Sequence, residues 1–271
     1  MIGQIIQGYR ISELVRGDHI DQHPNVYRAT RIIDLANAVV KFAPKALPET
    51  SILARTKHPI FPKLYASGQR EDAFFAIMQD FDRGNLTDRM ASGVQLQTVI
   101  SAIRQIAMAL DELHGLGFVH GDIKPEHIVF TYTGNPGLID YGVASPIGES
   151  AASDNPSGHT AQLSPGYASP EQITGRELGG STDLYSLGIV FYQILTGRLP
   201  YTDPDPKVML QKHLQEPIPR LPNHLAPLQS VIDLLLAKRS EQRFQNGKML
   251  SDALASIALD TQLPNLTIKT Q

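Results

Sequence analysis

Apolar and polar residues alternate over short distances in the first third of the chain. Within residues 9–42, the runs YRISELV, NVYRAT and NAVVKFA are separated by polar stretches that contain glycine, aspartate, histidine and proline. This pattern is typical of antiparallel strands joined by turns. The runs FPKLYASG and DAFFAIMQDF predict two further strands, so we expect the N-terminal part of the chain to form a small sheet.

One short helix is expected to interrupt these strands. Pro48 fits the first position of a helix, where its missing N–H and fixed backbone angle are tolerated. A helix over residues 49–57 would end before His58-Pro59, because the residue that precedes a proline avoids the helical region.

From Gln95 onward the apolar spacing becomes helical and continues until Gly115 and Gly117 stop it. The apolar residues that recur with this period are Val99, Ile103, Ile106, Ala107, Leu110 and Leu113. The sequence therefore predicts that the second part of the chain is mostly helical.

Further elements are predicted in this second part. Residues 183–195 form a strongly apolar helix, and residues 205–215, 225–238 and 247–258 form amphipathic segments. The pieces HIVF and GLID are expected to be short strands on either side of a turn at Thr133-Gly134-Asn135. Residues 145–166 are rich in serine, glycine and proline and predict a long loop, and the last dozen residues predict a tail.

Composition excludes several classes of protein. The chain has 271 residues and a formal charge of −3, with 24 basic and 27 acidic residues, so we expect no binding to nucleic acid. It contains no cysteine, which excludes disulfides and thiolate nucleophiles and predicts a cytoplasmic protein. The opening MIGQIIQGYR lacks the features of a signal peptide, and no stretch approaches the roughly 20 apolar residues of a membrane span. We therefore expect no membrane insertion.

The segments HGDIKPEHIVF at 120–130 and LIDYG at 138–142 carry the densest chemical signal. Each places an aspartate in a loop between short strands. Such a pair suits a reaction in which one carboxylate accepts a proton and the other holds a metal ion. Taken alone, each motif is also ordinary turn chemistry, because aspartate and glycine both favour turns.

These two loops resemble the H-R-D-x-K-x-x-N and D-F-G motifs of the protein kinase family. Three more segments resemble that family in the same order along the chain: AVVK at 38–41, SPGYASPEQ at 164–172 and STDLYSLGIVFYQILTGRLPY at 181–201. The chain is identified as a member of the eukaryotic-type (Hanks-type) Ser/Thr protein kinases, in their bacterial style. The resemblance covers roughly residues 9–258.

The resemblance implies an α+β, bilobal fold with a small β-rich N-lobe, a shortened αC helix and a larger helical C-lobe. We expect one domain, with the N-lobe at about 9–78, the hinge at about 79–84, the C-lobe at about 85–258 and a tail at 259–271.

The resemblance also implies roles for individual residues. Asp122 would orient and deprotonate the acceptor hydroxyl, Lys124 would balance charge on the transferred phosphoryl group, and Asp140 would bind magnesium. Lys41 would contact the α- and β-phosphates of ATP and pair with Glu49. The other nucleotide-binding positions are Val26, Val39, Met78 and Val129, although Met78 is equally natural as a buried strand residue.

Four positions are expected to shape the substrate platform. Glu171 would pair with Arg243, and Asp183, in the apolar helix, would hold the catalytic loop at residues 120–127. Ser164 stands where the family has a threonine near the acceptor, and together with Lys124 it favours serine or threonine over tyrosine as the acceptor.

The glycine-rich loop departs from the family pattern. Its three glycine positions are taken by His19, Asp21 and Pro24, and only Gly17 remains. These replacements remove an amide donor and add an acidic group near the phosphates. We therefore predict weaker binding of ATP or poorer ordering of its γ-phosphate.

His127 replaces the asparagine that holds the second magnesium ion in the family. Magnesium prefers oxygen ligands, whereas imidazole suits softer metals, so a metal role for His127 predicts better turnover with manganese than with magnesium. In the alternative interpretation, His127 only hydrogen-bonds Asp122 or the backbone.

Gly121 replaces the arginine that receives a phosphorylated activation loop in the family. We therefore expect that Ser157 and Thr160 can be phosphorylated but that activity does not depend on it.

Three functional hypotheses follow. The first is a soluble Ser/Thr protein kinase that uses ATP and Mg²⁺, or Mn²⁺ by preference, acts on a protein substrate or signalling partner and autophosphorylates. The second is a pseudokinase that binds partners with little or no catalysis. The third is a kinase for small molecules, which draws only on the H-G-D loop and His127. The sequence predicts no oligomeric state.

Overall fold

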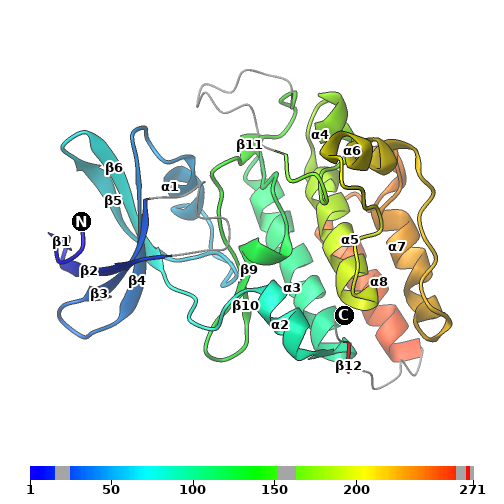
Figure 1. Cartoon of the computed structure of the whole chain (residues 1–271), viewed down its shortest axis with the longest axis horizontal. Helices are drawn as coiled ribbons and strands as arrows, with labels where there is room; N and C mark the ends of the chain where they lie inside the picture. Colours follow the sequence, from blue (N-terminus) through cyan, green and yellow to red (C-terminus); the bar gives the residue numbers. More distant parts are fainter. Residues whose placement is uncertain (16–24, 152–162, 261–266, 269–271) are drawn as a thin grey trace.

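The computed structural model describes residues 1–15, 25–151, 163–260 and 267–268. Within these residues the chain folds into a β-rich N-lobe and a larger helical C-lobe, which lie side by side (Figure 1). The α+β bilobal fold expected from the sequence is confirmed. No helix among the described residues combines the length and the apolar character needed to cross a bilayer.

The N-lobe is built on one antiparallel sheet with the strand order β1-β2-β3-β4-β6-β5. Its strands are β1 (Ile5–Ile6), β2 (Tyr9–Leu14), β3 (Val26–Arg31), β4 (Asn37–Ala43), β5 (Leu64–Arg70) and β6 (Ala73–Gln79). Alternation along β4 defines the two faces of this sheet. Ala38, Val40 and Phe42 are buried in a small core on one face, whereas Val39 and Lys41 are half-buried on the other.

Helix α1 (Pro48–Leu53) is shorter than the helix predicted over residues 49–57. Pro48 occupies the predicted first position, but the helix ends at Leu53. Four residues later, the backbone amides of Lys57 and His58 donate to the carboxylate of Glu112 on a C-lobe helix. This tertiary contact draws the chain away from the helical path before the proline at position 59.

The C-lobe contains the helices predicted from periodicity and two short helices, at 86–92 and 170–174, that were not predicted. They are α2 (Leu86–Ser92), α3 (Leu96–Gly115), α4 (Pro170–Thr174), α5 (Gly180–Thr196), α6 (Pro206–Gln215), α7 (Gln229–Leu235) and α8 (Gly247–Asp260). Short 3₁₀ turns are η1 (Pro125–His127), η2 (Asn223–Leu228) and η3 (Ser240–Gln242). The single amphipathic segment expected at 225–238 is divided between η2 and α7, and Pro227 lies inside the 3₁₀ part.

Helices α3 and α8 pack closely at the centre of the C-lobe. A side-chain carbon on Gly247 would lie 1.8 Å from the backbone oxygen of Ala107, so only glycine fits at the start of α8. Asp111 of α3 accepts hydrogen bonds from the amides of Gly247 and Lys248 and thereby fixes this end of α8. The main hydrophobic core surrounds these helices and α5, and it also includes Ile52 and Leu53 of α1.

Three two-stranded ladders complete the fold. They pair β9 (Ile128–Phe130) with β10 (Pro136–Leu138), β8 (Phe118–Val119) with β11 (Ser145–Pro146), and β7 (Val94–Gln95) with β12 (Thr267–Ile268). The strands expected in HIVF and GLID are thus present as β9 and β10. Strand β12 lies within the predicted tail, where the Gln95 amide donates to the Thr267 hydroxyl at 2.7 Å.

Candidate active site

Four residues expected to contact a nucleotide share one face of the N-lobe sheet. Val26 lies opposite Lys41, and Val39 lies opposite Met78 in the strand register. Directly opposed residues point to the same face, as do residues two apart in a strand. Val26, Val39, Lys41 and Met78 are therefore grouped on the half-buried face, opposite the small N-lobe core. The fifth, Val129, is buried on β9 of the C-lobe.

Lys41 connects two carboxylates from different parts of the chain. Its Nζ lies 3.0 Å from Glu49 Oε2 and 3.1 Å from Asp140 Oδ1. Burial alone would lower the pKa of Lys41, but the charges of Asp140 and Glu49 raise it above its usual value. Glu49 is in the first turn of α1, directly after Pro48, so the proline that starts the helix also places this carboxylate beside Lys41.

Asp140 has a φ of +66°, a left-handed conformation that is uncommon for residues other than glycine. The next residue, Tyr141, fixes the loop. Its ring is buried against His120, with centroids 4.8 Å apart, and its hydroxyl donates to the backbone oxygen of Leu138 at 2.8 Å. Packing around Tyr141 therefore maintains the unusual backbone that directs Asp140 at Lys41.

Asp183 holds the catalytic loop from within the core. It is almost fully buried on α5, and its carboxylate accepts hydrogen bonds from the backbone amides of His120 and Gly121 at 2.8 and 2.9 Å. The ring of His114, at the end of α3, lies 2.8 Å from the same carboxylate. Burial alone would raise the pKa of Asp183, but these contacts lower it. No motif in the sequence marks His114.

Asp122 is the centre of a second polar cluster. Lys124 Nζ lies 2.8 Å from one oxygen of the Asp122 carboxylate, and the Ser164 hydroxyl donates to the other at 2.7 Å. Lys124 also donates to the Ser164 hydroxyl at 3.1 Å. The structure thus brings together three residues that were singled out from two separate motifs.

His127 lies between Asp122 and Asp140. Its Nδ1 is 2.8 Å from the backbone oxygen of Asp122, and its Nε2 is 3.5 Å from Asp140 Oδ2. Burial lowers the pKa of His127, which favours the neutral ring. Donation of Nδ1–H to the carbonyl leaves the Nε2 lone pair on the side of Asp140. The hydrogen-bond and metal-ligand interpretations of His127 are therefore compatible with each other.

The residues present fit a divalent ion held only in part by protein. Asp140 supplies a carboxylate and His127 an unprotonated nitrogen, both of which are usual ligands of first-row metals. Among the described residues, no group of three or more acidic or histidine side chains could hold a metal ion by itself. Further ligands would have to come from a bound nucleotide or water.

Gly121 has a φ of +81°, and a side-chain carbon there would lie 3.3 Å from the Val143 carbonyl oxygen. Its own carbonyl accepts a hydrogen bond from the Gln172 side chain at 2.7 Å. This contact links the catalytic loop to α4. No motif in the sequence marks Gln172, because its partner lies 51 positions away along the chain.

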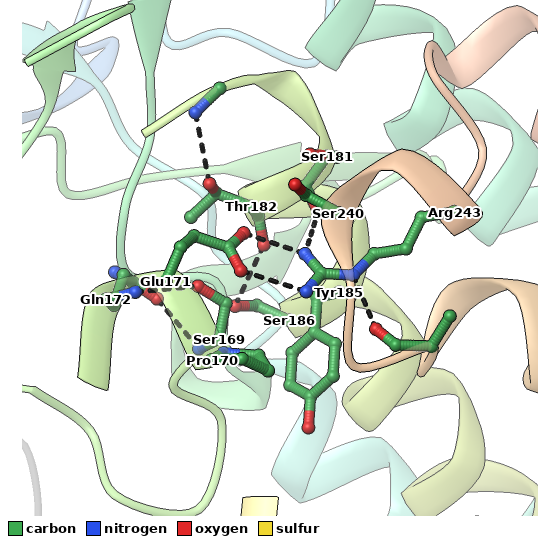
Figure 2. A network of polar contacts seen from close by, with 12 residues as sticks. Ser169, Pro170, Glu171, Gln172, Ser181, Thr182, Tyr185, Ser186, Ser240 and Arg243 are labelled. Carbon is green, nitrogen blue, oxygen red and sulfur yellow. Dashed lines mark hydrogen bonds and ion pairs between the residues drawn. The ribbon is translucent and has the colours of Figure 1, made fainter. Parts of the chain in front are cut away.

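Glu171 and Arg243 form a buried bidentate ion pair, with distances of 2.7 and 2.9 Å (Figure 2). Arg243 also donates to the carbonyls of Ser181 and Ala237. Burial would raise the pKa of Glu171, but Arg243 lowers it below its usual value. The pair joins α4 to the segment that precedes α8 (Figure 2).

Several predicted positions cannot be placed. Ser157 and Thr160 lie outside the described residues, as do the altered glycine positions His19, Asp21 and Pro24.

Comparison with known proteins identifies the family. The family model described as "Protein kinase domain" matches residues 17–254. The chain is 29% identical over 231 residues to the serine/threonine-protein kinase pkn2 of Myxococcus xanthus. The aligned region covers 80% of this chain and 28% of that protein. It is 32% identical over 175 residues to PknA of Mycobacterium tuberculosis, covering 63% of this chain and 39% of that protein. PknJ of Mycobacterium tuberculosis is 28% identical over 273 aligned positions, covering 94% of this chain and 46% of that protein.

All three relatives are serine/threonine-protein kinases by name, so these matches give no support to the pseudokinase alternative. The chain spans less than half of the length of each. Its fold, its motifs in their order along the chain and the matched family model agree, and the chain belongs to the family of eukaryotic-type (Hanks-type) serine/threonine protein kinases.

Proposed function

We propose that this chain transfers the γ-phosphoryl group of ATP to serine or threonine hydroxyls of a protein and that it also phosphorylates itself. The observation that carries the proposal is the assembly of two polar clusters. Lys41 lies between Glu49 and Asp140, and Asp122 lies between Lys124 and Ser164. His127 lies between the two clusters.

We assign each residue the role that the resemblance to the kinase family implies, and the contacts of each residue support that role. Asp122 accepts the proton of the acceptor hydroxyl, because its carboxylate faces Ser164 at the substrate platform. Lys124 offsets the negative charge that develops on the transferred group, since its ammonium is held beside Asp122. Lys41 binds the phosphates that do not react, and Glu49 orients its side chain.

Asp140 and His127 would hold a divalent ion together with oxygens of the nucleotide. When bound, such an ion neutralises phosphate charge and orients the phosphates for in-line transfer. We include a relative preference for manganese in the proposal, because a nitrogen donor replaces the oxygen donor that magnesium favours. A cytoplasmic location, expected from the absence of cysteine, belongs to the same proposal.

The test is transfer of labelled γ-phosphate from ATP to the chain itself and to a protein acceptor, with magnesium and manganese separately. The native chain is compared with Asp122→Asn and Asp140→Asn, which change one charge each and keep the side-chain shape. We expect incorporation that both substitutions abolish. Incorporation at the level of the two variants in both metals, with folded protein, would contradict the proposal and favour a pseudokinase.

A second part of the proposal concerns the activation loop. Gly121 offers no side chain to a phosphate, and its carbonyl is bonded to Gln172. We propose that the order of the platform does not depend on phosphorylated Ser157 or Thr160. The double alanine variant should therefore keep its transfer rate to a protein acceptor, and loss of that rate in a folded protein would be evidence for a phosphorylation switch.

A further inference from the structure

A fully buried histidine lies in the C-lobe, next to the loop segment Pro165-Gly166. His213 is on α6 and has an exposed fraction of 0%. Its ring lies among tyrosines, with centroid distances of 5.8 Å to Tyr185 and 4.9 Å to Tyr201. Lys238 donates to the His213 backbone oxygen and to the Tyr201 hydroxyl, both at 2.8 Å. In most buried histidines, both ring nitrogens have hydrogen-bond partners.

One ring nitrogen is bonded and the other is not. Nδ1 lies 2.9 Å from the Tyr185 hydroxyl, whereas Nε2 has no hydrogen-bond partner among the described residues. The backbone carbonyls of Pro165 and Gly166 act on this ring. Because Nδ1 is occupied by the Tyr185 hydroxyl, these carbonyls are the acceptors available to Nε2. A hydrogen on Nε2 makes Nδ1 the acceptor of the Tyr185 hydroxyl hydrogen. Burial and the charge of Lys238 lower the pKa of His213 to about 4, so the ring is neutral at pH 7.

Pro165 and Gly166 belong to residues 164–168, which we call the substrate loop. At its start, the Ser164 hydroxyl donates to Asp122. At its end, the Tyr167 carbonyl accepts from Ser186 and the Tyr167 hydroxyl donates to Gln193, both at 2.8 Å. A side-chain carbon on Gly166 would lie 2.9 Å from Leu199, so the middle of the loop rests directly on the body of the C-lobe. His213 is the polar group beneath this middle part.

We propose that His213 is a positioning residue for the substrate loop: its Nε2–H is directed at the carbonyls of Pro165 and Gly166 and, in solution, donates to one of them, which holds the loop on α6. The contact holds Ser164 in register with Asp122 and Lys124. This inference rests on the proposed kinase function. It extends that function by assigning a buried residue outside every motif to recognition of the protein substrate.

Loss of the His213 contact should affect phosphorylation of the protein acceptor but not the use of ATP. The substrate loop meets the protein acceptor, whereas ATP is bound by Lys41 and Asp140, so loss of the donor should affect the two substrates differently. Replacing His213 with leucine should raise the KM for an acceptor protein roughly tenfold, the effect of about one hydrogen bond. The kcat for ATP hydrolysis without acceptor should stay within about twofold of the native value.

The experiment compares the native chain with His213→Leu, His213→Gln and the exposed control His224→Leu. Glutamine keeps an N–H donor and should restore much of the KM, whereas leucine keeps only bulk. Equal losses in acceptor phosphorylation and ATP hydrolysis by folded His213→Leu would overturn the proposal, and so would an unchanged KM. If the leucine variant does not fold, the glutamine variant and Tyr185→Phe, which frees Nδ1, decide by the same split between KM and hydrolysis.

Amide hydrogen exchange separates this inference from the proposed function. The amides of Tyr167 and Ala168 donate to the Ser164 carbonyl at 2.9 and 3.1 Å, so their exchange reports opening of the substrate loop. Faster exchange of these two amides in His213→Leu, with unchanged exchange elsewhere in the C-lobe, supports the contact even in a chain that transfers no phosphate. Unchanged exchange at both amides would refute the contact whether or not the native chain is active.

Discussion

At the scale of single residues, Asp140 connects the two sides of the site. One oxygen of its carboxylate faces Lys41 on the N-lobe sheet, and the other faces His127 in the catalytic loop. A change at His127 therefore alters the surroundings of the carboxylate proposed to bind the metal ion, and Lys41 and Glu49 need not move.

This position provides a direct test of metal preference. His127→Asn replaces the ring nitrogen with an amide oxygen, which magnesium prefers. We expect the ratio of the transfer rate with magnesium to that with manganese to rise at least severalfold relative to the native chain. The exposed substitution His224→Asn serves as the control. An unchanged ratio would mean that His127 acts only through its hydrogen bond to the Asp122 carbonyl.

The buried pair Glu171–Arg243 predicts a dependence of stability on pH. Because the folded pKa of Glu171 is lower than its unfolded value near 4.5, the pair stabilises the fold above pH 4.5. That contribution is lost as pH falls through the folded pKa. Glu171→Gln should cost about 3–5 kcal/mol near neutral pH, because it leaves the buried Arg243 unpaired.

Urea unfolding at pH 7 and at progressively lower pH measures this effect. The stability difference between the native chain and Glu171→Gln should shrink as pH falls below about 4.5. Glu241→Gln is the matched control, because Glu241 pairs with Arg239 at an exposed site and should change stability little. A difference that stays constant over this pH range would contradict the assigned pKa direction.

At the scale of elements, the connection between β4 and α1 is short, as the shortened helix expected from the sequence requires. Pro44 and Pro48 lie at its two ends, and α1 has six residues. Ile52 and Leu53 pack in the main core shared with the C-lobe, so α1 is anchored there while the connection ties Glu49 to the strand that carries Lys41. The ion pair is thus assembled by chain connectivity as well as by charge.

Lengthening the connection between β4 and α1 should lower the rate of phosphoryl transfer while leaving stability nearly unchanged. Four glycine and serine residues inserted after Lys45 should lower the transfer rate at least tenfold, because Glu49 is no longer held beside Lys41. The unfolding midpoint should change little, since a longer loop costs only about 0.6 kcal/mol per doubling of its length. The same insertion between Glu71 and Asp72, in the turn from β5 to β6, is the control. Equal rates in both insertion variants would show that the connection has no such role.

The elements that sequence patterns predicted well are those with local causes. Periodic apolar residues specify α3 and α5, and the turn at Gly134 specifies the β9–β10 hairpin. The early end of α1 was not predicted, because it depends on Glu112, more than 50 residues away. The pairing of β12 with β7 likewise depends on a contact across 172 positions.

In the candidate site, too, residues in local motifs were predicted and residues that act through distant contacts were not. Asp122, Lys124, Asp140 and Lys41 were found because their spacing matches known motifs. His114 and Gln172 were missed because each acts on a distant residue: His114 lies beside Asp183, and Gln172 bonds the carbonyl of Gly121. Neither contact leaves a local pattern in the chain.

At the scale of the whole molecule, the described residues form two hydrophobic cores, and polar contacts also connect the two lobes. The N-lobe sheet has its own core, and the C-lobe core reaches as far as α1. Glu112 on α3 accepts the amides of Lys57 and His58, so it connects the segment after α1 to the longest helix of the C-lobe. This contact helps set how the N-lobe is placed over the C-lobe.

Removing this carboxylate should loosen the connection. Glu112→Ala should speed amide hydrogen exchange at Lys57 and His58 and lower the free energy of unfolding by about 1–3 kcal/mol. The control is Gln97→Ala, an exposed substitution on the same helix. If the exchange of both amides were unchanged, the Glu112 carboxylate would have no part in fixing this segment.

Met78 has a practical consequence for finding what this chain phosphorylates. Its half-buried side chain faces Val39 across the sheet and packs at the margin of the main core. Shortening it to alanine leaves a volume that the native chain lacks. Because we expect Met78 to lie beside the base of bound ATP, we predict that an ATP analogue with one additional alkyl group on its base binds the Met78→Ala variant better than the native chain. In a cell extract, the label from such an analogue would mark the products of this one enzyme among those of all others.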